Sequence, residues 1–456
     1  MNAGGSRRVV YLAAVLLALL ALSGFARSDV AGASRSSRTS ASGQQGIGAL
    51  RICSSCSQAG NLGRYDYVIL NSWDAPLIPR LKAQNPNLKA LVYKNLSFTV
   101  SNTCSHGKDD ASLPTGVGYC AAGASHPDWF LTGTNGERVN SEYFPDSWLM
   151  DVGNPGYQQQ WLSDVSTDLR ANGWDGVFVD DTDASIAWHL HGRSLARYPT
   201  DAAWRQATRS MLARVGPAVM SAGFLFVPNL SAPWASDYDA QATWRDWLRF
   251  TSGAAQEYYT KWGTSSSSWF AGDDWTFRQQ FQAITEQAGK IFLGITYAPK
   301  GDARSMLYAR ANFLLFHDPK NRGALIYEAT DPEAQDPYSS QWTADVGRPL
   351  GSRFKVGAAW RRNFAGGVVL VNPSSASVTV KVSASRSVTL GPTSGAILRS
   401  LSPSSASAPQ HVARHTASKA HRIAASVSVS APEQRLFKGR VLWLPRHATR
   451  QPLIRR

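Results

Sequence analysis

Between residue 47 and about residue 330, short apolar runs alternate with longer segments of helical periodicity. The apolar runs are rich in β-branched and aromatic residues, which is typical of parallel strands buried on both faces. Eight runs are expected to be strands: 48–52, 67–70, 88–93, 176–180, 224–228, 254–258, 291–297 and 324–328. This repeated strand–helix alternation predicts an α/β fold, a (β/α)8 TIM barrel over residues 47–345.

The pattern changes beyond residue 350. Five short runs of strand character lie at 354–360, 367–371, 377–382, 387–390 and 396–398, separated by turn sequences. They predict a small C-terminal all-β module, sandwich-like, over residues 350–400. About fifty residues bury little core by themselves, so this module should pack on the barrel.

The two ends of the chain have different patterns again. Arg7 and Arg8 precede a short apolar run at 9–22, and Ala31-Gly32-Ala33 matches a cleavage site for a signal peptide of residues 1–33. An uncleaved membrane anchor is the alternative. Residues 34–46 are Ser- and Gly-rich and are expected to be a flexible linker. Residues 401–456 lack periodicity and are expected to be a disordered tail.

Charge is concentrated in these ends. The net charge of the chain is +15, of which residues 1–46 carry +4 and residues 401–456 carry +9. The body between them is close to neutral, which argues against a specific nucleic-acid partner. The basic tail could make non-specific contacts with anionic cell-envelope polymers. The expected protein is a monomer in the extracellular space or the cell envelope.

Four cysteines agree with an oxidising destination. Cys104 and Cys120 enclose a Gly-rich stretch within segment 95–148, which is too long for an ordinary βα loop and is expected to be a functional excursion. Cys53 and Cys56 could form a second bridge, although four cysteines allow three pairings. No His cluster accompanies them at ligand spacing, so neither a metal nor a cofactor is expected.

Acidic residues stand where barrel enzymes carry their chemistry, at the carboxyl ends of strands. The fourth predicted strand ends in Asp180 and Asp181, with Asp183 close behind, and the sixth contains Glu257. Strand alternation places Asp180 on the same face as Phe178, and we expect that face to be the barrel mouth. Asp181 and Asp183 either bind substrate or cap the following helix. Glu257 could instead form an ion pair with an arginine.

A pair of carboxyl groups facing each other across a barrel mouth is what glycoside hydrolysis requires. The chain also has 16 tryptophans, all but Trp443 between Trp73 and Trp360, and a surplus of Trp suits the stacking of sugar rings. Other polar or aromatic residues that follow strands or lie in βα loops are candidate substrate-binding groups: Asn71, Trp73, Tyr93, Lys94, Asp151, Asn229, Tyr297 and Glu328. For Asn229 and Asp151 the alternatives are a turn residue and a loop-fixing hydrogen bond.

Several segments together resemble a glycoside-hydrolase-like barrel family related to the endo-α-1,4-polygalactosaminidases. They are Tyr67–Asn71, Leu91–Tyr93, Asp151–Pro155 and the run Gly173–Asp180, with Arg361–Phe364 and Asn372-Pro373 similar to a small C-terminal β module. The resemblance covers roughly residues 47–400. It implies that Asp180, which ends strand four, is a catalytic carboxylate. It places the partner acid less firmly, with Glu257 the best match and Glu328 the second.

Two functions follow from these observations. The first is an exported glycoside hydrolase that cleaves a polysaccharide or oligosaccharide, with Asp180 as nucleophile and Glu257 as acid/base, within the carboxyl separation of a retaining enzyme. Aromatic neighbours of Glu257 are expected to raise its pKa, although Asp181 and Asp183 could raise that of Asp180 instead and reverse the roles. The second is a non-catalytic carbohydrate-binding surface protein on the same barrel. Convergence of the two carboxyl groups on one site distinguishes the first from the second.

Overall fold

The computed structural model describes residues 46–52, 61–231, 239–299 without 262, 264 and 266, 301–329, 343 and 346–399. The expected signal peptide at 1–33, nearly all of the linker at 34–46, the cysteine pair Cys53 and Cys56 and the tail at 401–456 lie outside these residues.

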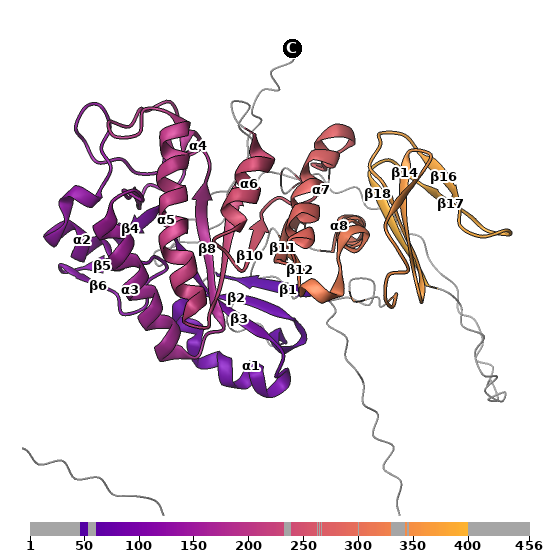
Figure 1. Cartoon of the computed structure of the whole chain (residues 1–456), viewed down its shortest axis with the longest axis horizontal. Helices are drawn as coiled ribbons and strands as arrows, with labels where there is room; N and C mark the ends of the chain where they lie inside the picture. The colour runs from indigo at the N-terminus through magenta and orange to yellow at the C-terminus, as the bar shows by residue number, and fades with distance from the viewer. Residues whose placement is uncertain are drawn as a thin grey trace, which may run out of the picture. The chain divides into compact units, whose positions relative to one another are not determined.

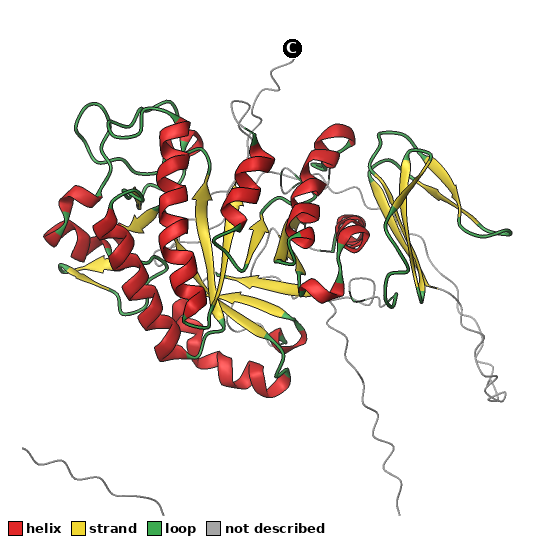
Figure 2. Cartoon of the chain, viewed as in Figure 1, coloured by secondary structure: helices red, strands yellow, loops and turns green. Residues whose placement is uncertain are grey.

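Eight parallel strands close into a barrel in the order β1-β12-β11-β10-β9-β8-β3-β2. Figures 1 and 2 show these strands at the centre of the molecule. The eight predicted strands are confirmed, with ends that agree or shift by up to three residues. The barrel strands are β1 (Ile47–Arg51), β2 (Tyr67–Leu70), β3 (Lys89–Asn95), β8 (Gly176–Asp183), β9 (Leu225–Ser231), β10 (Gly253–Gln256), β11 (Ile291–Ala298) and β12 (Ala324–Ala329).

Alternation along each strand divides the core into two layers. Side chains such as Ile69, Phe178 and Ile295 fill the barrel interior. Their neighbours, such as Val68 and Val177, face outward into the layer between strands and helices. Burial on both faces explains why the strands read as nearly continuous apolar runs in the sequence.

Helices cover the outside of the barrel (Figure 2). They are α1 (Ile78–Gln84), α3 (Pro155–Asn172), α5 (Asp201–Ser221), α6 (Ala240–Leu248), α7 (Gly272–Gln287) and α8 (Ala303–Phe316), with the short α4 (Ala187–Leu190) directly after β8. α3 has strong end signals. The Asn154 side chain accepts hydrogen bonds from the backbone amides of Gly156 and Tyr157, and Gly173 ends the helix in the left-handed region at φ 71°.

Among the residues that the structure describes, no helix combines the length and the apolar character needed to cross a membrane.

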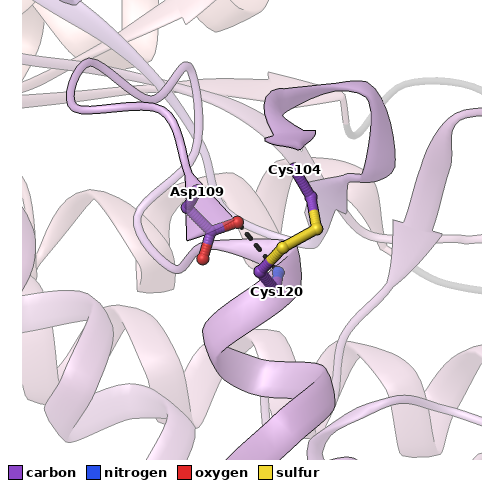
Figure 3. Close-up of side chains that lie close together, drawn as sticks. All are labelled: Cys104, Asp109 and Cys120. Carbon is purple, nitrogen blue, oxygen red and sulfur yellow. Dashed lines mark hydrogen bonds between the residues drawn. A yellow bond between two sulfur atoms is a disulfide. The ribbon is translucent and has the colours of Figure 1, made fainter. Parts of the chain in front are cut away.

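The long excursion after β3 has its own small elements. β4 (Phe98–Val100) pairs with β7 (Ser147–Leu149), and β5 (Cys104–Ser105) pairs with β6 (Lys108–Asp109) beside α2 (Tyr119–Ser125). Cys104 and Cys120 form a disulfide, which confirms that pairing (Figure 3). The Asp109 carboxylate accepts hydrogen bonds from the backbone amides of Cys120 and Ala121, both at 2.8 Å, and thereby caps the start of α2.

The C-terminal module is all-β, as predicted. β13 (Phe354–Val356), β14 (Ala359–Phe364), β15 (Gly367–Asn372) and β18 (Ser394–Arg399) form one antiparallel sheet, and β16 (Val378–Lys381) pairs with β17 (Ser387–Leu390). The predicted strand 354–360 is two strands instead, because the chain turns at Gly357, where φ is 61°. This left-handed conformation strongly favours glycine.

The module packs on α8 of the barrel. Arg362 donates hydrogen bonds to the carbonyl oxygens of Leu314 and His317 at the end of that helix. A Cβ atom at position 395 would lie 2.7 Å from Cβ of Ala311, so Gly395 allows β18 to approach α8 closely. The β module therefore uses the barrel as part of its core, as its small size requires.

Candidate active site

Asp180 lies on β8 and points into the barrel mouth. The hydroxyl of Tyr93 on β3 donates to its Oδ2 at 2.6 Å, and the amide of Asn229 on β9 donates to its Oδ1 at 2.9 Å. Phe178, two residues earlier, belongs to the interior layer. The alternation argument therefore assigns the correct face to Asp180.

Asp181 departs from that alternation. The β8–β9 register shifts between Val179 and Thr182, and Asp181 adopts a left-handed φ of 49°. Such a bulge re-aims one side chain. The Asp181 carboxylate accepts a hydrogen bond from the amide of Asn95 on β3.

Glu257 comes directly after β10 and is half-buried. The hydroxyl of Tyr297 on β11 donates to its Oε1 at 2.9 Å. The amide nitrogen of Asn229 donates to its Oε2 at 2.8 Å, while the Asn229 side-chain oxygen accepts from the Glu257 backbone amide at 3.3 Å. Glu257 thus faces the same side of the barrel as Asp180.

One amide nitrogen bridges the two carboxyl groups. Asn229 Nδ2 lies 2.9 Å from Asp180 Oδ1 and 2.8 Å from Glu257 Oε2, so these two oxygens are at most about 5.7 Å apart. Their strands are next but one in the barrel, and the strand between them supplies the bridge. Parallel strand ends therefore bring together two acids that are far apart in sequence.

The two carboxyl groups have unequal proton affinities. Burial, reinforced by the negative charge of Asp181, raises the pKa of Asp180 to about 6, although hydrogen bonds from Tyr93 and Asn229 oppose this. Burial and the charge of Asp180 raise the pKa of Glu257 further, to about 8, against hydrogen bonds from Tyr297 and Asn229. Near neutral pH the proton therefore belongs to Glu257, and Asp180 is mainly ionised.

A buried histidine holds the neighbouring acids. His189 Nε2 of α4 lies 3.5 Å from Asp181 Oδ1 and 3.4 Å from Asp183 Oδ2, and its Nδ1 is hydrogen-bonded to the hydroxyl of Ser141. Burial disfavours the imidazolium, but hydrogen bonds and charge from both aspartates outweigh it and raise the pKa of His189 to about 9. The imidazolium thus offsets the charge of Asp181 and Asp183.

Two groups of side chains in the described part of the chain have metal-ligand spacing. The first is the cluster of Asp181, Asp183 and His189, whose ligand atoms lie within 4.8 Å of one another. A protonated histidine already accounts for its geometry. The second is Cys104, Asp109 and Cys120, whose sulfur atoms are joined in a disulfide.

Five of the predicted site residues converge on one site: Tyr93, Asp180, Asn229, Glu257 and Tyr297. Asp181 and Asp183 lie beside them, in contact with His189. Glu328 lies on β12, opposite Tyr297 in the register, but its side chain is outside the described atoms.

The remaining predicted residues have other partners. Lys94 points away from the mouth and forms an ion pair with Asp168 of α3 at 2.7 Å, because its neighbour Tyr93 points inward. Asp151 pairs with Arg197 at 2.8 Å and accepts hydrogen bonds from the Tyr198 hydroxyl and the Gly153 amide. These contacts fix the loop around Asp151. Asp151 therefore has the structural role that was the alternative to substrate binding.

Asn71 and Trp73 begin the 3-10 helix Ser72–Leu77. Asn71 forms a capping box with Asp74, so its side chain serves the start of this helix. Trp73 is half-buried within the same turn.

His189 and Asn95 were not predicted as site residues. Neither belongs to a recognisable motif, and the contact of His189 with Asp181 depends on the bulge in β8. The signal that could have indicated His189 is its position six residues after Asp183, in the βα connection where barrel enzymes place their functional groups.

Solved structures similar to this chain include several glycosidase barrels. The glycoside hydrolase domain of PelA from Pseudomonas aeruginosa is 16% identical, with a TM-score of 0.39, over 63% of this chain and 96% of that one. Ega3 from Aspergillus fumigatus in complex with galactosamine is 12% identical, with a TM-score of 0.36, over 63% and 92%. An alpha-amylase from Malbranchea cinnamomea is 9% identical, with a TM-score of 0.43, over 78% and 96%. Because all three scores are low, the fold assignment rests on the barrel topology itself.

A comparison with curated proteins finds no match. A family model does match, over residues 82–368, and its description is "hypothetical glycosyl hydrolase family 15". The matched region is more than half of the chain and includes Asp180, Asn229 and Glu257. The resemblance to a glycoside-hydrolase-like barrel family is thereby confirmed. The chain belongs to the hypothetical glycosyl hydrolase family 15.

Proposed function

We propose that this protein is an exported, retaining glycoside hydrolase that cleaves a polysaccharide, with Asp180 as nucleophile and Glu257 as general acid/base. The observation that carries the proposal is the shared donor, Asn229, between the two carboxyl groups. Asp180 Oδ1 and Glu257 Oε2 are at most about 5.7 Å apart. This upper bound is compatible with the ~5–5.5 Å typical of retaining enzymes and is shorter than the ~6.5–9.5 Å of inverting ones.

The proton distribution supports the same division of roles. Protonated Glu257 donates its proton to the glycosidic oxygen while ionised Asp180 attacks the anomeric carbon, so the C–O bond to the leaving sugar breaks as a glycosyl–Asp180 ester forms. Glu257, now ionised, then removes a proton from water, and the resulting hydroxide displaces Asp180. Each residue ends in its starting state.

Neutral hydrogen-bond donors fit this cycle. Tyr93 and Tyr297 each hold one oxygen of Asp180 and Glu257, respectively, and Asn229 holds the other oxygen of both. A cationic partner would lower the pKa of Glu257 and deprive the site of its acid at neutral pH. Orientation by neutral donors fixes the carboxyl groups and still permits proton exchange.

Export is supported by the Cys104–Cys120 disulfide, since structural disulfides persist in oxidising compartments. The apolar run at 9–22 fits the same conclusion as a signal peptide. Sugar as the substrate class is supported by membership of a glycosyl hydrolase family. The resemblance to endo-α-1,4-polygalactosaminidases makes an amino-sugar polymer the first substrate to test.

The alternative function is a carbohydrate-binding protein without catalysis. Such a protein would be expected to have one of the two acids neutralised by a structural partner. None of the ion pairs among the described residues involves Asp180 or Glu257. This observation favours the enzyme.

The test is a screen of the purified full chain against a panel of neutral and amino-sugar polysaccharides, with release of reducing ends as the readout. We expect hydrolysis of at least one polymer, retention of anomeric configuration in the first product seen by proton NMR, and a loss of at least ~10³-fold in Asp180→Asn. Unchanged hydrolysis by Asp180→Asn would exclude this residue as nucleophile. An inverted product would exclude the retaining mechanism.

A further inference from the structure

Two exposed aromatic rings lie together beside the candidate active site. Tyr143 and Trp188 are both 42% exposed, although most large aromatic side chains in the described residues are buried. Their ring centroids are 4.5 Å apart and their planes differ by 15°, so the two rings are stacked. We refer to Tyr143 and Trp188 as the aromatic pair.

The aromatic pair joins two segments that are separate in sequence. Trp188 lies on α4, which directly follows β8, and Tyr143 lies on the excursion after β3. Figure 1 shows α4 beyond the end of β8. Asp180 lies in the C-terminal half of that strand, which spans Gly176–Asp183. Both segments therefore belong to the catalytic face.

One residue, His189, ties the pair to the site. Its backbone carbonyl accepts a hydrogen bond of 2.9 Å from the backbone amide of Glu142. Its ring is hydrogen-bonded to the hydroxyl of Ser141. The Trp188 ring meets the His189 ring edge-to-face, with centroids 4.5 Å apart. The same imidazole contacts Asp181 and Asp183. These contacts join the backbone next to Tyr143 and the ring next to Trp188 to the acids of the site.

Polar groups surround the pair. The neighbouring Glu142 side chain is 51% exposed and lies 3.9 Å from Arg193, whose guanidinium also donates to the Asn140 side chain and backbone. An exposed ring flanked by exposed hydrogen-bonding groups suits a pyranose, whose face is apolar and whose edge carries hydroxyl or amino groups. A protein partner would require a much larger apolar patch.

We propose that Tyr143 and Trp188 form a binding subsite for a pyranose unit of the polysaccharide, beyond the sugar held between Asp180 and Glu257. The inference rests on the proposed function, because it takes the ligand to be the polymer that the site cleaves. The subsite adds affinity for long chains and directs the polymer along the β8–α4 side of the mouth.

The test measures binding separately from hydrolysis. In the full chain carrying Asp180→Asn, affinity electrophoresis in gels containing dextran, xylan, chitosan or polygalactosamine gives a dissociation constant for each polymer. Adding Trp188→Ala or Tyr143→Ala should weaken binding to the best polymer about five- to tenfold, the usual contribution of one aromatic contact. Tyr143→Phe keeps the ring and should retain most of the affinity.

Phe354→Ala is the matched control, because Phe354 is 43% exposed but lies on β13 of the C-terminal module. It should bind like the Asp180→Asn parent. Equal binding by the Tyr143 and Trp188 variants, or no binding of the parent to any polymer, would overturn the subsite. Hydrolysis that persists in Asp180→Asn would instead contradict the proposed catalytic role, and the binding result would still decide the subsite.

Discussion

The wall of the barrel separates two groups of ionisable side chains. Adjacent residues of β3, Tyr93 and Lys94, contribute one to each group. Inside, Tyr93 holds Asp180, which shares the Asn229 amide with Glu257. Outside, Lys94 forms an ion pair with Asp168. The inner acids accept hydrogen bonds from the neutral donors Tyr93, Asn229 and Tyr297, and burial raises the pKa values of both. Lys94 lowers the pKa of the outer acid, Asp168, against the effect of its burial.

The sign of the partner determines what each carboxyl group can do. Asp168 stays ionised, and its contribution is to the stability of the fold. Burial disfavours the charged form of both Asp180 and Glu257, and the charge of Asp180 adds to this effect on Glu257. This costs stability at neutral pH but leaves one proton available for transfer. The same strand, β3, thus contributes a structural lysine to one face and a site tyrosine to the other.

The largest expected effect is on catalysis. Glu257→Gln removes the proton donor while it preserves the size of the side chain, so kcat/KM on a polysaccharide should fall by ~10²–10⁴-fold. Asp168→Asn is the outer counterpart and should leave kcat/KM within about twofold while the protein remains folded. Steady-state rates of reducing-end release compare the two. Similar losses of kcat/KM in both variants would contradict the assignment of catalysis to the inner acids and of a structural role to Asp168.

The next effect is on stability. Lys94→Met leaves the Asp168 carboxylate buried without its cation, so the free energy of unfolding should fall by about 3 kcal/mol. Lys82→Met is the control, because Lys82 pairs with Asp175 but its side chain is 28% exposed, and its loss should be about 1 kcal/mol or less. Urea denaturation measures both. Equal losses would show that burial of Lys94 adds nothing to its ion pair.

The raised pKa of Glu257 should make the protein less stable as the pH increases. The lowered pKa of Asp168 should have the opposite effect. The pKa of Glu257 rises from 4.5 to about 8 on folding, so the folded state binds more protons between those values. The stabilisation that protonated Glu257 gives the folded state is fully present below pH ~4.5. It is lost as the pH rises through about 8. Glu257→Gln should therefore be more stable than wild type at pH 9, by on the order of 2 kcal/mol, and nearly equal at pH 4. Thermal melts across this range test it, and a variant destabilised at pH 9 would contradict it.

The smallest expected effect comes from the C-terminal tail. Deletion of residues 401–456 removes a segment of +9 net charge without apolar periodicity. The melting temperature should change by no more than about 1 °C, because the tail should contribute no core. A large decrease in the melting temperature would show that the tail packs on the folded body.

Much of the fold could be predicted because its signals are local. Each barrel strand is an apolar run, and the end signals of α3, Asn154 and Gly173, lie within the helix boundary itself. The alternation of side chains along a strand also places Asp180 at the barrel mouth, because Phe178, two residues earlier, faces the barrel interior. The same rule, applied to Tyr93, would have sent Lys94 outward, so that residue could have been removed from the candidate site.

Other features depend on contacts that no local pattern contains. The bulge that turns Asp181 toward Asn95 and His189 comes from the β8–β9 register. The role of Asn229 as a bridge requires three adjacent strands in a known order. The sequence therefore predicted Asn229 as a cleft residue but not as the group that links the two acids.

The most direct test of the account is the titration of the inner pair itself. Carbon-13 NMR of the Asp and Glu carboxyl groups, assigned with Asp180→Asn and Glu257→Gln, follows both protons without any substrate. The account predicts two coupled steps, with Asp180 ionising near pH 6 and Glu257 keeping its proton to about pH 8. Ionisation of both groups below pH 5 would contradict it, because no proton would then remain for the leaving sugar.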